Sequence, residues 1–455
     1  MNRLNTERLE SAIKYISGWL DFNYRDSRLP GIVVAIQHED KLLLNNAHGY
    51  ANQTEKIPMK SDHVFRVASQ SKTFTATAIM QLYEAGKLRL DDKISEHLDW
   101  FTSDLDEEVE NITIRHFLNH TSGLLRDDID ADYWQFDDEF PSRDELKNLV
   151  QNSKLRTLKT NQHFKYSNYA YSLLGQLIEA VSGLSYEEYM NESIISKLEL
   201  TNTYPELSPK ANSELADGHT AILFNNDRKI VSHKNTNGMS AATGFCSTAS
   251  DLCRYFMAHC YGNDTLINDS SKREMQHGYW SPEDDGEAYG LGLVEYRNRN
   301  GNLYGHGGGF PGFITNTRFR PTDKLVVSVM TNSWDGPASY IAKSIINIID
   351  YFQNNEGNIE DATAFEGRFY GRWHLLDIIN VNDKLIASSP RYWNDFENDA
   401  QEFTRINKNT LEAEKKSSYG SPGEELIYDF DDNGATRSVR FAGMKLLLEK
   451  DYLQS

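Results

Sequence analysis

Residues 65–72 read Phe65-Arg-Val-Ala-Ser-Gln-Ser-Lys72, with a serine and a lysine three positions apart. The preceding Val64-Phe-Arg-Val67 reads as extended, and apolar residues follow at helical spacing. A helix is therefore predicted to begin near Ser69 and to end at Gly86. Backbone N–H groups at a helix start point outward, and the helix dipole favours negative charge there. Lys72 returns to the same helix face, where it can reach the Ser69 hydroxyl.

This pair of residues suits nucleophilic catalysis. A serine hydroxyl is a poor nucleophile until a base removes its proton, and a lysine with a lowered pKa can be that base. The spacing alone is not specific, because Ser11-Ala-Ile-Lys14 also has it within a charged N-terminal segment. Ser69 and Lys72 therefore become candidates only in combination with other residues.

Tyr166-Ser-Asn168 is a second candidate stretch. Its tyrosine can relay a proton, and its asparagine amide can hold Lys72 and a substrate carbonyl. The pattern is also found at Tyr50-Ala-Asn52, and an isolated tyrosine more often serves packing. This stretch too needs the context of the others.

A glycine-rich run, Tyr304-Gly-His-Gly-Gly-Gly-Phe-Pro-Gly-Phe313, is the strongest of the three signals. Glycine weakens strands, so five glycines in ten residues indicate close approach of a ligand to the backbone. The run precedes a predicted strand, and its N–H groups are expected to edge a cleft. A flexible loop or a bulged sheet edge is the alternative.

Together and in this order, the three stretches resemble the signature of the serine β-lactamase and penicillin-binding-protein superfamily. The resemblance is closest to its branch of esterases and D-amino-acid peptidases related to class C β-lactamases, and it covers roughly residues 20–350. Asn119-His-Thr-Ser-Gly-Leu124 and the segment 243–252 look like further landmarks of that branch. His120 is expected to hold a turn, and Asp251 to cap a helix.

The resemblance implies a role for each candidate. Ser69 would be acylated, with Lys72 and Tyr166 sharing proton transfer. Asn168 would contact the substrate and Lys72. The backbone N–H groups of Ser69 and Gly309 would form the oxyanion hole, where each donor is worth about 3–4 kcal/mol in comparable sites.

One departure from the family pattern concerns substrate binding. The third motif is often Lys-Thr-Gly, which helps to hold a substrate carboxylate, whereas His306, Gly307 and Gly308 occupy the matching positions here. The permanent charge becomes a histidine expected to titrate near neutrality, and the hydroxyl is lost. Weak β-lactamase activity and better turnover of small esters or short amides are predicted.

The fold class predicted is α+β. Strand patterns at both ends of the first 355 residues bracket a helical middle, which indicates one antiparallel sheet flanked by helices, with an inserted helical lobe. Helices are expected at 5–22, 169–181, 249–258 and 338–352, and strands at 31–36, 42–44, 289–294, 312–320 and 325–330.

A change in composition marks the predicted domain boundary. Residues 1–355 form the hydrolase-like domain, and the polar segment 356–362 is a linker. Residues 363–455 contain short aromatic and β-branched segments between turns, which is typical of a small antiparallel β-barrel or sandwich. This tail resembles the lipocalin-like domain that some members of the branch carry.

Composition limits the partners. Acidic residues outnumber basic ones by 67 to 47, and a net charge of −20 argues against nucleic acid and anionic membranes as partners. Neither a secretory signal nor a run of about 18 apolar residues is evident, so a soluble, cytoplasmic protein is expected. Cys246, Cys253 and Cys260 are expected to be buried, reduced thiols. Oligomeric state is not readable.

Three other function classes would need different sequence features. An α/β-hydrolase would need a Gly-x-Ser-x-Gly elbow, which the chain lacks. A metalloenzyme is disfavoured because the histidines are scattered and no Cys-x-x-Cys pair occurs, so no metal or cofactor is expected. A non-catalytic or slowly acylated penicillin-binding, peptide-sensing or assembly protein on the same scaffold remains the alternative to an esterase or peptidase. The expected substrates are small esters, amides or short peptides.

Overall fold

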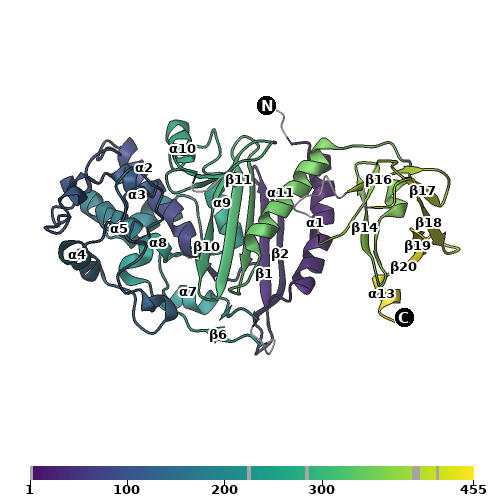
Figure 1. Cartoon of the computed structure of the whole chain (residues 1–455), viewed down its shortest axis with the longest axis horizontal. Helices are drawn as coiled ribbons and strands as arrows, with labels where there is room; N and C mark the ends of the chain where they lie inside the picture. Colours follow the sequence, from purple (N-terminus) through teal and green to yellow (C-terminus); the bar gives the residue numbers. More distant parts are fainter. Residues whose placement is uncertain (1–3, 223–226, 282–285, 392–399, 417–419, 455) are drawn as a thin grey trace. The chain divides into compact units, whose positions relative to one another are not determined.

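The computed structural model describes residues 4–222, 227–281, 286–391, 400–416 and 420–454. The chain forms two compact units (Figure 1). One runs from Leu29 to Ala342, and the other joins the segment up to Arg28 to the segment from Lys343 onward. This division differs from the predicted boundary at residue 355.

The difference has two parts, because residues 343–355 and helix α1 (Thr6–Asp26) both belong to the C-terminal unit. The Tyr15 hydroxyl donates a hydrogen bond of 2.7 Å to Asp377, and the Trp19 indole donates one of 2.9 Å to the carbonyl of Pro390. Both bonds join residues more than 350 positions apart in the chain. The amphipathic pattern of α1 does not reveal such partners.

The unit Leu29–Ala342 contains an eight-stranded antiparallel sheet in the order β3-β2-β1-β12-β11-β10-β9-β8. Strand β1 pairs with β12, with Ile32 opposite Thr331 and Ile36 opposite Val327. The prediction that both ends of this region build one sheet is therefore confirmed. The strands are β1 (Gly31–His38), β2 (Lys41–Asn52), β3 (Ile57–Pro58), β8 (Glu287–Tyr289), β9 (Val294–Tyr296), β10 (Leu303–Phe310), β11 (Phe313–Arg320) and β12 (Leu325–Thr331).

One strand prediction was wrong, and another was incomplete. Residues 289–294 were expected to form one strand, but Tyr289 ends β8, Val294 begins β9, and residues 290–293 connect them, with Gly292 at φ of +76°. The glycine-rich run precedes strand β11, as expected, and in addition forms most of strand β10. Its register with β11 is continuous from Tyr304 opposite Phe319 to Phe310 opposite Phe313, so the alternative of a bulged edge is also wrong.

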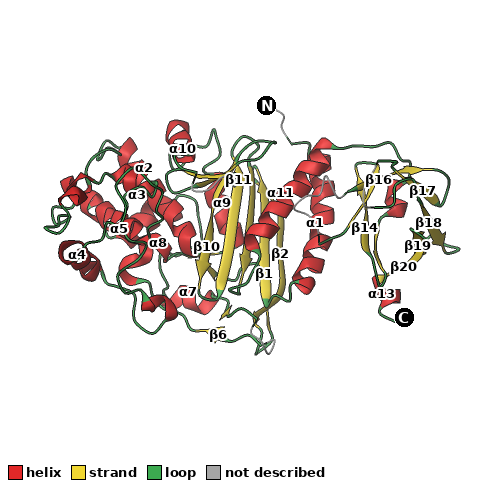
Figure 2. Ribbon diagram, viewed as in Figure 1, coloured by secondary structure: helices red, strands yellow, loops and turns green. Residues whose placement is uncertain are grey.

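Helices form a lobe on one side of this sheet (Figure 2). The predicted helices at 169–181 and 249–258 are present as α5 and α9. All three cysteines are buried and form no disulfide. The helices of the unit are α2 (Ser71–Glu84), α3 (Ile114–Leu118), α4 (Arg143–Asn152), α5 (Asn168–Ser182), α6 (Tyr186–Met190), α7 (Pro209–Glu214), α8 (Ser240–Thr243), α9 (Ala249–Met257) and α10 (Asp269–Gln276). Helix α11 (Ala338–Asn354) runs from this unit into the other.

The C-terminal unit contains a closed eight-stranded barrel, as predicted. Each strand pairs with its neighbour in sequence, and β13 pairs with β20 to close the barrel, which leaves no free sheet edge. Its strands are β13 (Gly367–Tyr370), β14 (Leu375–Val381), β15 (Lys384–Ser388), β16 (Gln401–Arg405), β17 (Thr410–Ala413), β18 (Glu425–Phe430), β19 (Thr436–Phe441) and β20 (Met444–Leu448). Among the described residues of the chain, no helix is both long and apolar enough to cross a bilayer.

Candidate active site

Ser69 lies in a 3₁₀ turn, Ala68–Gln70, that leads directly into α2. Ala68 has φ of +49°, in the left-handed region that residues with a Cβ atom rarely adopt. The Ser71 hydroxyl holds this turn, since it donates 2.6 Å to the Ala68 carbonyl and accepts 3.0 Å from the Phe245 amide. Strained backbone of this kind costs about 1–3 kcal/mol and persists only where surrounding contacts fix it.

Lys72 is completely buried, and its Nζ atom has three polar neighbours. It donates 2.7 Å to Asn168 Oδ1 and 2.8 Å to the carbonyl of Ala242, and it lies 3.3 Å from Ser69 Oγ. A neutral lysine has two N–H bonds and one lone pair. The first two acceptors use both N–H bonds, so the lone pair is free to accept from Ser69.

Electrostatics favour this neutral form. Burial lowers the pKa of Lys72 well below its ordinary value, because a charged amine loses its hydration. The Asp127 carboxylate opposes this shift, and the Arg126 guanidinium adds to it. The amine is therefore deprotonated more easily than that of an ordinary lysine, which suits a general base.

Tyr166 completes the group around the nucleophile. The Ser69 side chain is close enough to the Tyr166 hydroxyl to oppose the rise of its pKa, and Lys72 Nζ lies 4.8 Å from the centre of its ring. Burial raises the pKa of Tyr166 above its usual value, so the phenol keeps its proton. The pKa values of Lys72 and Tyr166 are thus displaced in opposite directions, which suits a base and an acid acting in one site.

His120 positions this tyrosine. Its Nδ1 atom accepts a hydrogen bond of 3.1 Å from the amide of Ser167, and its ring centre lies 4.2 Å from that of Tyr166. Burial lowers the pKa of His120 well below its ordinary value, which leaves the ring neutral and able to accept this bond. His120 has a structural role, as expected, but its side chain fixes the distant segment at Tyr166 and Ser167 rather than the turn that follows it.

Asn168, the first residue of α5, links Lys72 to a carboxylate. While its Oδ1 accepts from Lys72, its Nδ2 donates 2.7 Å to Asp127. The indole of Trp134 donates a further 3.0 Å to the same oxygen of Asp127. The sequence motifs do not reveal Asp127 and Trp134 as part of the site. Only the position of Asp127, three residues after the landmark ending at Leu124, could have drawn attention to it.

Gly308 allows strand β10 to lie against the nucleophile turn. A Cβ atom here would lie 2.6 Å from Thr315 Oγ1 and 2.9 Å from the carbonyl carbon of Val67, and closer still to the Val67 oxygen. No side chain fits in that space. The predicted reason for the glycines, close approach to backbone, holds at Gly308, but the partner is the protein's own chain rather than a ligand.

Gly309 is exposed in the cleft. Phe310 pairs with Phe313 across the two-residue turn Pro311-Gly312, so these two residues exchange backbone hydrogen bonds. Hydrogen-bonded and non-hydrogen-bonded pairs alternate along an antiparallel ladder, so the N–H of Gly309 points away from β11. On that other side, β9 pairs with β10 only at Leu303–Gly305. This N–H is therefore free to serve the oxyanion hole expected from the sequence.

The burial and the pKa of His306 differ from those predicted. Its side chain is only 5% exposed, and burial, with the nearby Lys72, lowers its pKa to about 3. The expectation of titration near neutrality is therefore wrong. Nε2 lies 3.0 Å from the Tyr289 hydroxyl and Nδ1 lies 2.5 Å from the Gly307 carbonyl, so both ring nitrogens are occupied within the protein. His306, Gly307 and Gly308 do not line the described cleft.

The role of Asp251 also differs from the predicted one. It lies in the first turn of α9, but the helix cap is Thr248, whose hydroxyl accepts from the Asp251 amide. The Asp251 carboxylate instead accepts from the Asn202 amide at 2.9 Å and the Thr203 hydroxyl at 3.0 Å. Its role is to tether a neighbouring loop, which a local pattern cannot reveal.

A cleft of about 460 Å³ opens beside Ser69. Asn168 and Gly309 share its wall with the nucleophile. Arg126 and Asp127 are the charged residues among its described lining. The remaining lining residues are Trp134, Gln135, Thr220, Ala221, Val231, Pro311, Gly312 and Trp334.

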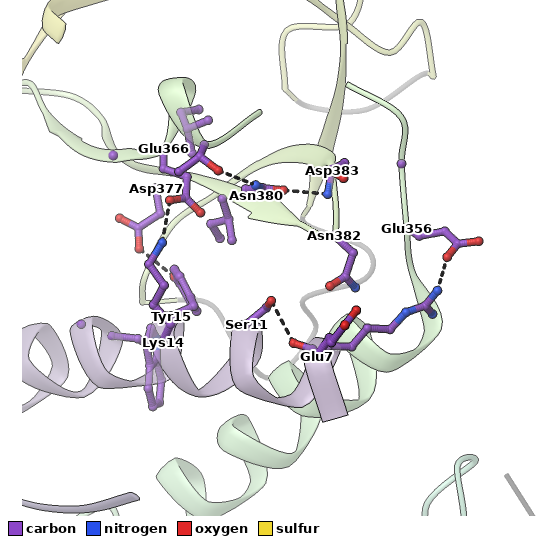
Figure 3. Close-up of a pocket in the computed structure, with 18 of the residues that line it drawn as sticks. Glu7, Ser11, Lys14, Tyr15, Glu356, Glu366, Asp377, Asn380, Asn382 and Asp383 are labelled. Atoms are coloured by element: carbon purple, nitrogen blue, oxygen red, sulfur yellow. Dashed lines mark hydrogen bonds and ion pairs between the residues drawn. The ribbon is translucent and has the colours of Figure 1, made fainter. Parts of the chain in front are cut away.

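A second cavity, of about 850 Å³, lies in the C-terminal unit and contains the other Ser-x-x-Lys stretch (Figure 3). Ser11 Oγ donates 3.0 Å to the carbonyl of Glu7, and Lys14 pairs with Glu366 at 3.1 Å. Neither side chain activates the other, as expected from the sequence. Across the described part of the chain, no group of three or more histidine, cysteine or acidic residues has an arrangement that could hold a metal ion.

The chain belongs to the β-lactamase family, because the family model described as Beta-lactamase matches residues 9–347. Penicillin-binding protein 4* of Bacillus subtilis (strain 168) is 32% identical over 307 residues, which are 63% of this chain and 64% of that protein. The chain thus matches less than two thirds of that relative's length.

Two solved structures share the fold. The octameric penicillin-binding protein homologue from Pyrococcus abyssi has a TM-score of 0.66 and 22% identity, and the match covers 96% of this chain and 98% of that one. A D-stereospecific amidohydrolase from Streptomyces sp. has a TM-score of 0.60 and 23% identity, with coverage of 74% and 97%. Because the first match covers 96% of this chain, it includes the C-terminal barrel.

Proposed function

We propose that this protein is a serine hydrolase that forms an acyl-enzyme with small esters or with short amide and D-amino-acid peptide substrates. Family membership supports the general class. The observation that carries the proposal is the geometry of Lys72, whose Nζ donates to Asn168 and to Ala242 and lies 3.3 Å from Ser69 Oγ, where the lone pair of the neutral amine can accept the hydroxyl proton.

The proposed reaction has two acyl-transfer steps. Ser69 Oγ attacks the substrate carbonyl carbon while Lys72 accepts the hydroxyl proton, and the N–H groups of Ser69 and Gly309 stabilise the oxyanion. As the tetrahedral intermediate collapses, Tyr166 gives its proton to the leaving oxygen or nitrogen and recovers one from Lys72. Water then attacks the acyl-enzyme in the same way, and Ser69 regains its hydroxyl.

Weak or absent β-lactamase activity is part of the proposal. A penicillin carries a carboxylate on its leaving-group side, and His306, at the position of the usual lysine, is buried and uncharged near neutral pH. A neutral, internally bonded histidine gives little attraction for an anion. The amidohydrolase among the structural neighbours supports including D-amino-acid amides among the candidate substrates.

The test is a substrate panel with matched serine variants. Purified protein is assayed with p-nitrophenyl butyrate, D-amino-acid amides and benzylpenicillin, alongside Ser69→Ala and the control Ser11→Ala. Loss of at least about a thousandfold in Ser69→Ala, with Ser11→Ala unchanged, is expected. Turnover of benzylpenicillin much faster than of the ester would overturn the preference, and no Ser69-dependent turnover would overturn the function.

A further inference from the structure

The cleft beside Ser69 extends to one side of the nucleophile. Its lining includes Ser69, Asn168 and Gly309, but neither Tyr166 nor His306. In the function proposed above, on which this inference rests, Tyr166 protonates the leaving group. The cavity therefore lies where the acyl part of a substrate would be held.

A tryptophan projects into this acyl side. Trp334 is 52% exposed, yet its backbone is fixed, because its amide donates 3.0 Å to the carbonyl of His219. Its ring atoms lie 3.7 and 3.9 Å from the position that a Cβ atom would take at Gly309. The edge of the indole's six-membered ring thus lies beside the backbone that would bind the oxyanion, and an aromatic side chain with few rotatable bonds binds an apolar group at low entropic cost.

Other apolar residues extend the same surface. Trp134 is held by Asp127, and its ring packs 5.0 Å from that of Phe140 and 5.9 Å from that of Phe310. Ala221, Val231 and Pro311 also line the cleft. Such a wall offers dispersion contacts and burial of apolar area to a bulky acyl group.

The charges of the cleft disfavour a cationic acyl group. Arg126, with a side chain 65% exposed, forms an ion pair of 3.4 Å with Asp127, and this buried carboxylate also accepts from Asn168 and Trp134. A free α-ammonium group would therefore meet a like charge before it met a carboxylate. We propose that the site selects substrates with an uncharged acyl group whose aromatic or branched apolar body lies against Trp334.

The first test compares acyl groups in matched variants. The kcat/KM values of p-nitrophenyl acetate, butyrate and phenylacetate are measured for wild type, Trp334→Ala and Trp373→Ala. Trp373 is a suitable control because it is 83% exposed and lies between barrel strands β13 and β14. Trp334→Ala is expected to lose about tenfold or more on phenylacetate, mainly through KM, and less than about threefold on acetate. Trp373→Ala should match wild type.

A second test addresses charge, with the p-nitroanilides of D-alanine and N-acetyl-D-alanine as probes. The N-acetyl compound is expected to have the higher kcat/KM. Equal losses on acetate and phenylacetate in Trp334→Ala, or a clear preference for the free amine, would overturn the inference while leaving a Ser69-dependent hydrolase intact. Absence of Ser69-dependent turnover of every probe would instead remove the proposed function, and this inference with it.

Discussion

Gly308→Ala would place a methyl group between strand β10 and the nucleophile turn. The new carbon would lie 2.6 Å from Thr315 Oγ1 and 2.9 Å from the carbonyl carbon of Val67, distances that real Cβ atoms essentially never show. Both neighbours are constrained. Val67 pairs with Phe245 through its amide, and Thr315 accepts 2.8 Å from the buried Gln70 amide.

The size of the effect follows from the displacement that relieves the overlap. The Val67 carbonyl must move by about 1 Å, two residues before Ser69, and a misplacement of that size in an active site costs about a hundredfold in rate. Overpacking of a well-packed site costs about 1–3 kcal/mol of stability. For a unit of this size, about 2 kcal/mol corresponds to a fall in Tm of roughly 5 °C.

Gly309→Ala is the matched comparison for stability. Its Cβ atom would lie 3.5 Å from Ile314 Cδ1 and at least 3.7 Å from Trp334, which is ordinary contact, so its Tm should stay within about 2 °C of wild type. The assay is thermal unfolding of both variants, together with kcat/KM of Gly308→Ala on p-nitrophenyl butyrate. A Gly308→Ala protein with wild-type Tm and activity would refute the reasoning, because it would mean that β10 does not hold the nucleophile turn.

Three further outcomes are expected. Asp127→Asn removes a charge that raises the pKa of Lys72, so the acid limb of the pH profile of kcat/KM should move to lower pH; an unmoved limb would contradict this electrostatic account. His120→Phe leaves the Ser167 amide without its acceptor, so chemical denaturation should show a loss of about 1–3 kcal/mol, and wild-type stability would exclude that role. Gly18→Ala, within α1 and with no atom near the new methyl group, should stabilise the C-terminal unit by about 1 kcal/mol in the same assay, and a destabilised variant would show hidden strain.

The pH dependence has a defined sign. Lys72 must be neutral to accept a proton, and its pKa is depressed by burial, so activity should rise with pH through that lowered pKa rather than near the ordinary lysine value. Tyr166 has a raised pKa, so it should lose its proton, and with it the ability to act as an acid, only at a pH above the usual pKa range of tyrosine. His306, with a pKa of about 3, should contribute no limb near pH 6.5.

The part of the site that the sequence could predict is local. Ser69 and Lys72 share one helix start, and their meeting depends on helical spacing alone. Tyr166 and Asn168 could be placed beside them only through resemblance to a known family, because their approach depends on packing between distant segments. The antiparallel sheet was predictable because short apolar strand patterns are recognisable in the sequence at both ends of residues 31–331.

Other features depend on tertiary surroundings and were missed. The pKa of His306 is set by burial, which its glycine neighbours do not suggest, since glycine-rich runs usually indicate exposed loops. Asp127 is recognisable only when Asn168 and Trp134 are seen to donate to it. The membership of α1 in the C-terminal unit likewise depends on its contact with Asp377, more than 350 residues away.

The most direct test of the central claim is mass spectrometry of the protein after reaction with a fluorophosphonate. Peptide mapping is expected to find one label, on Ser69, in wild type and in Ser11→Ala, and none in Ser69→Ala. A label with no ester turnover would favour a slowly acylated sensor. Labelling retained in Ser69→Ala, or absent from the peptide containing residue 69 in wild type, would contradict the account of this serine as the nucleophile.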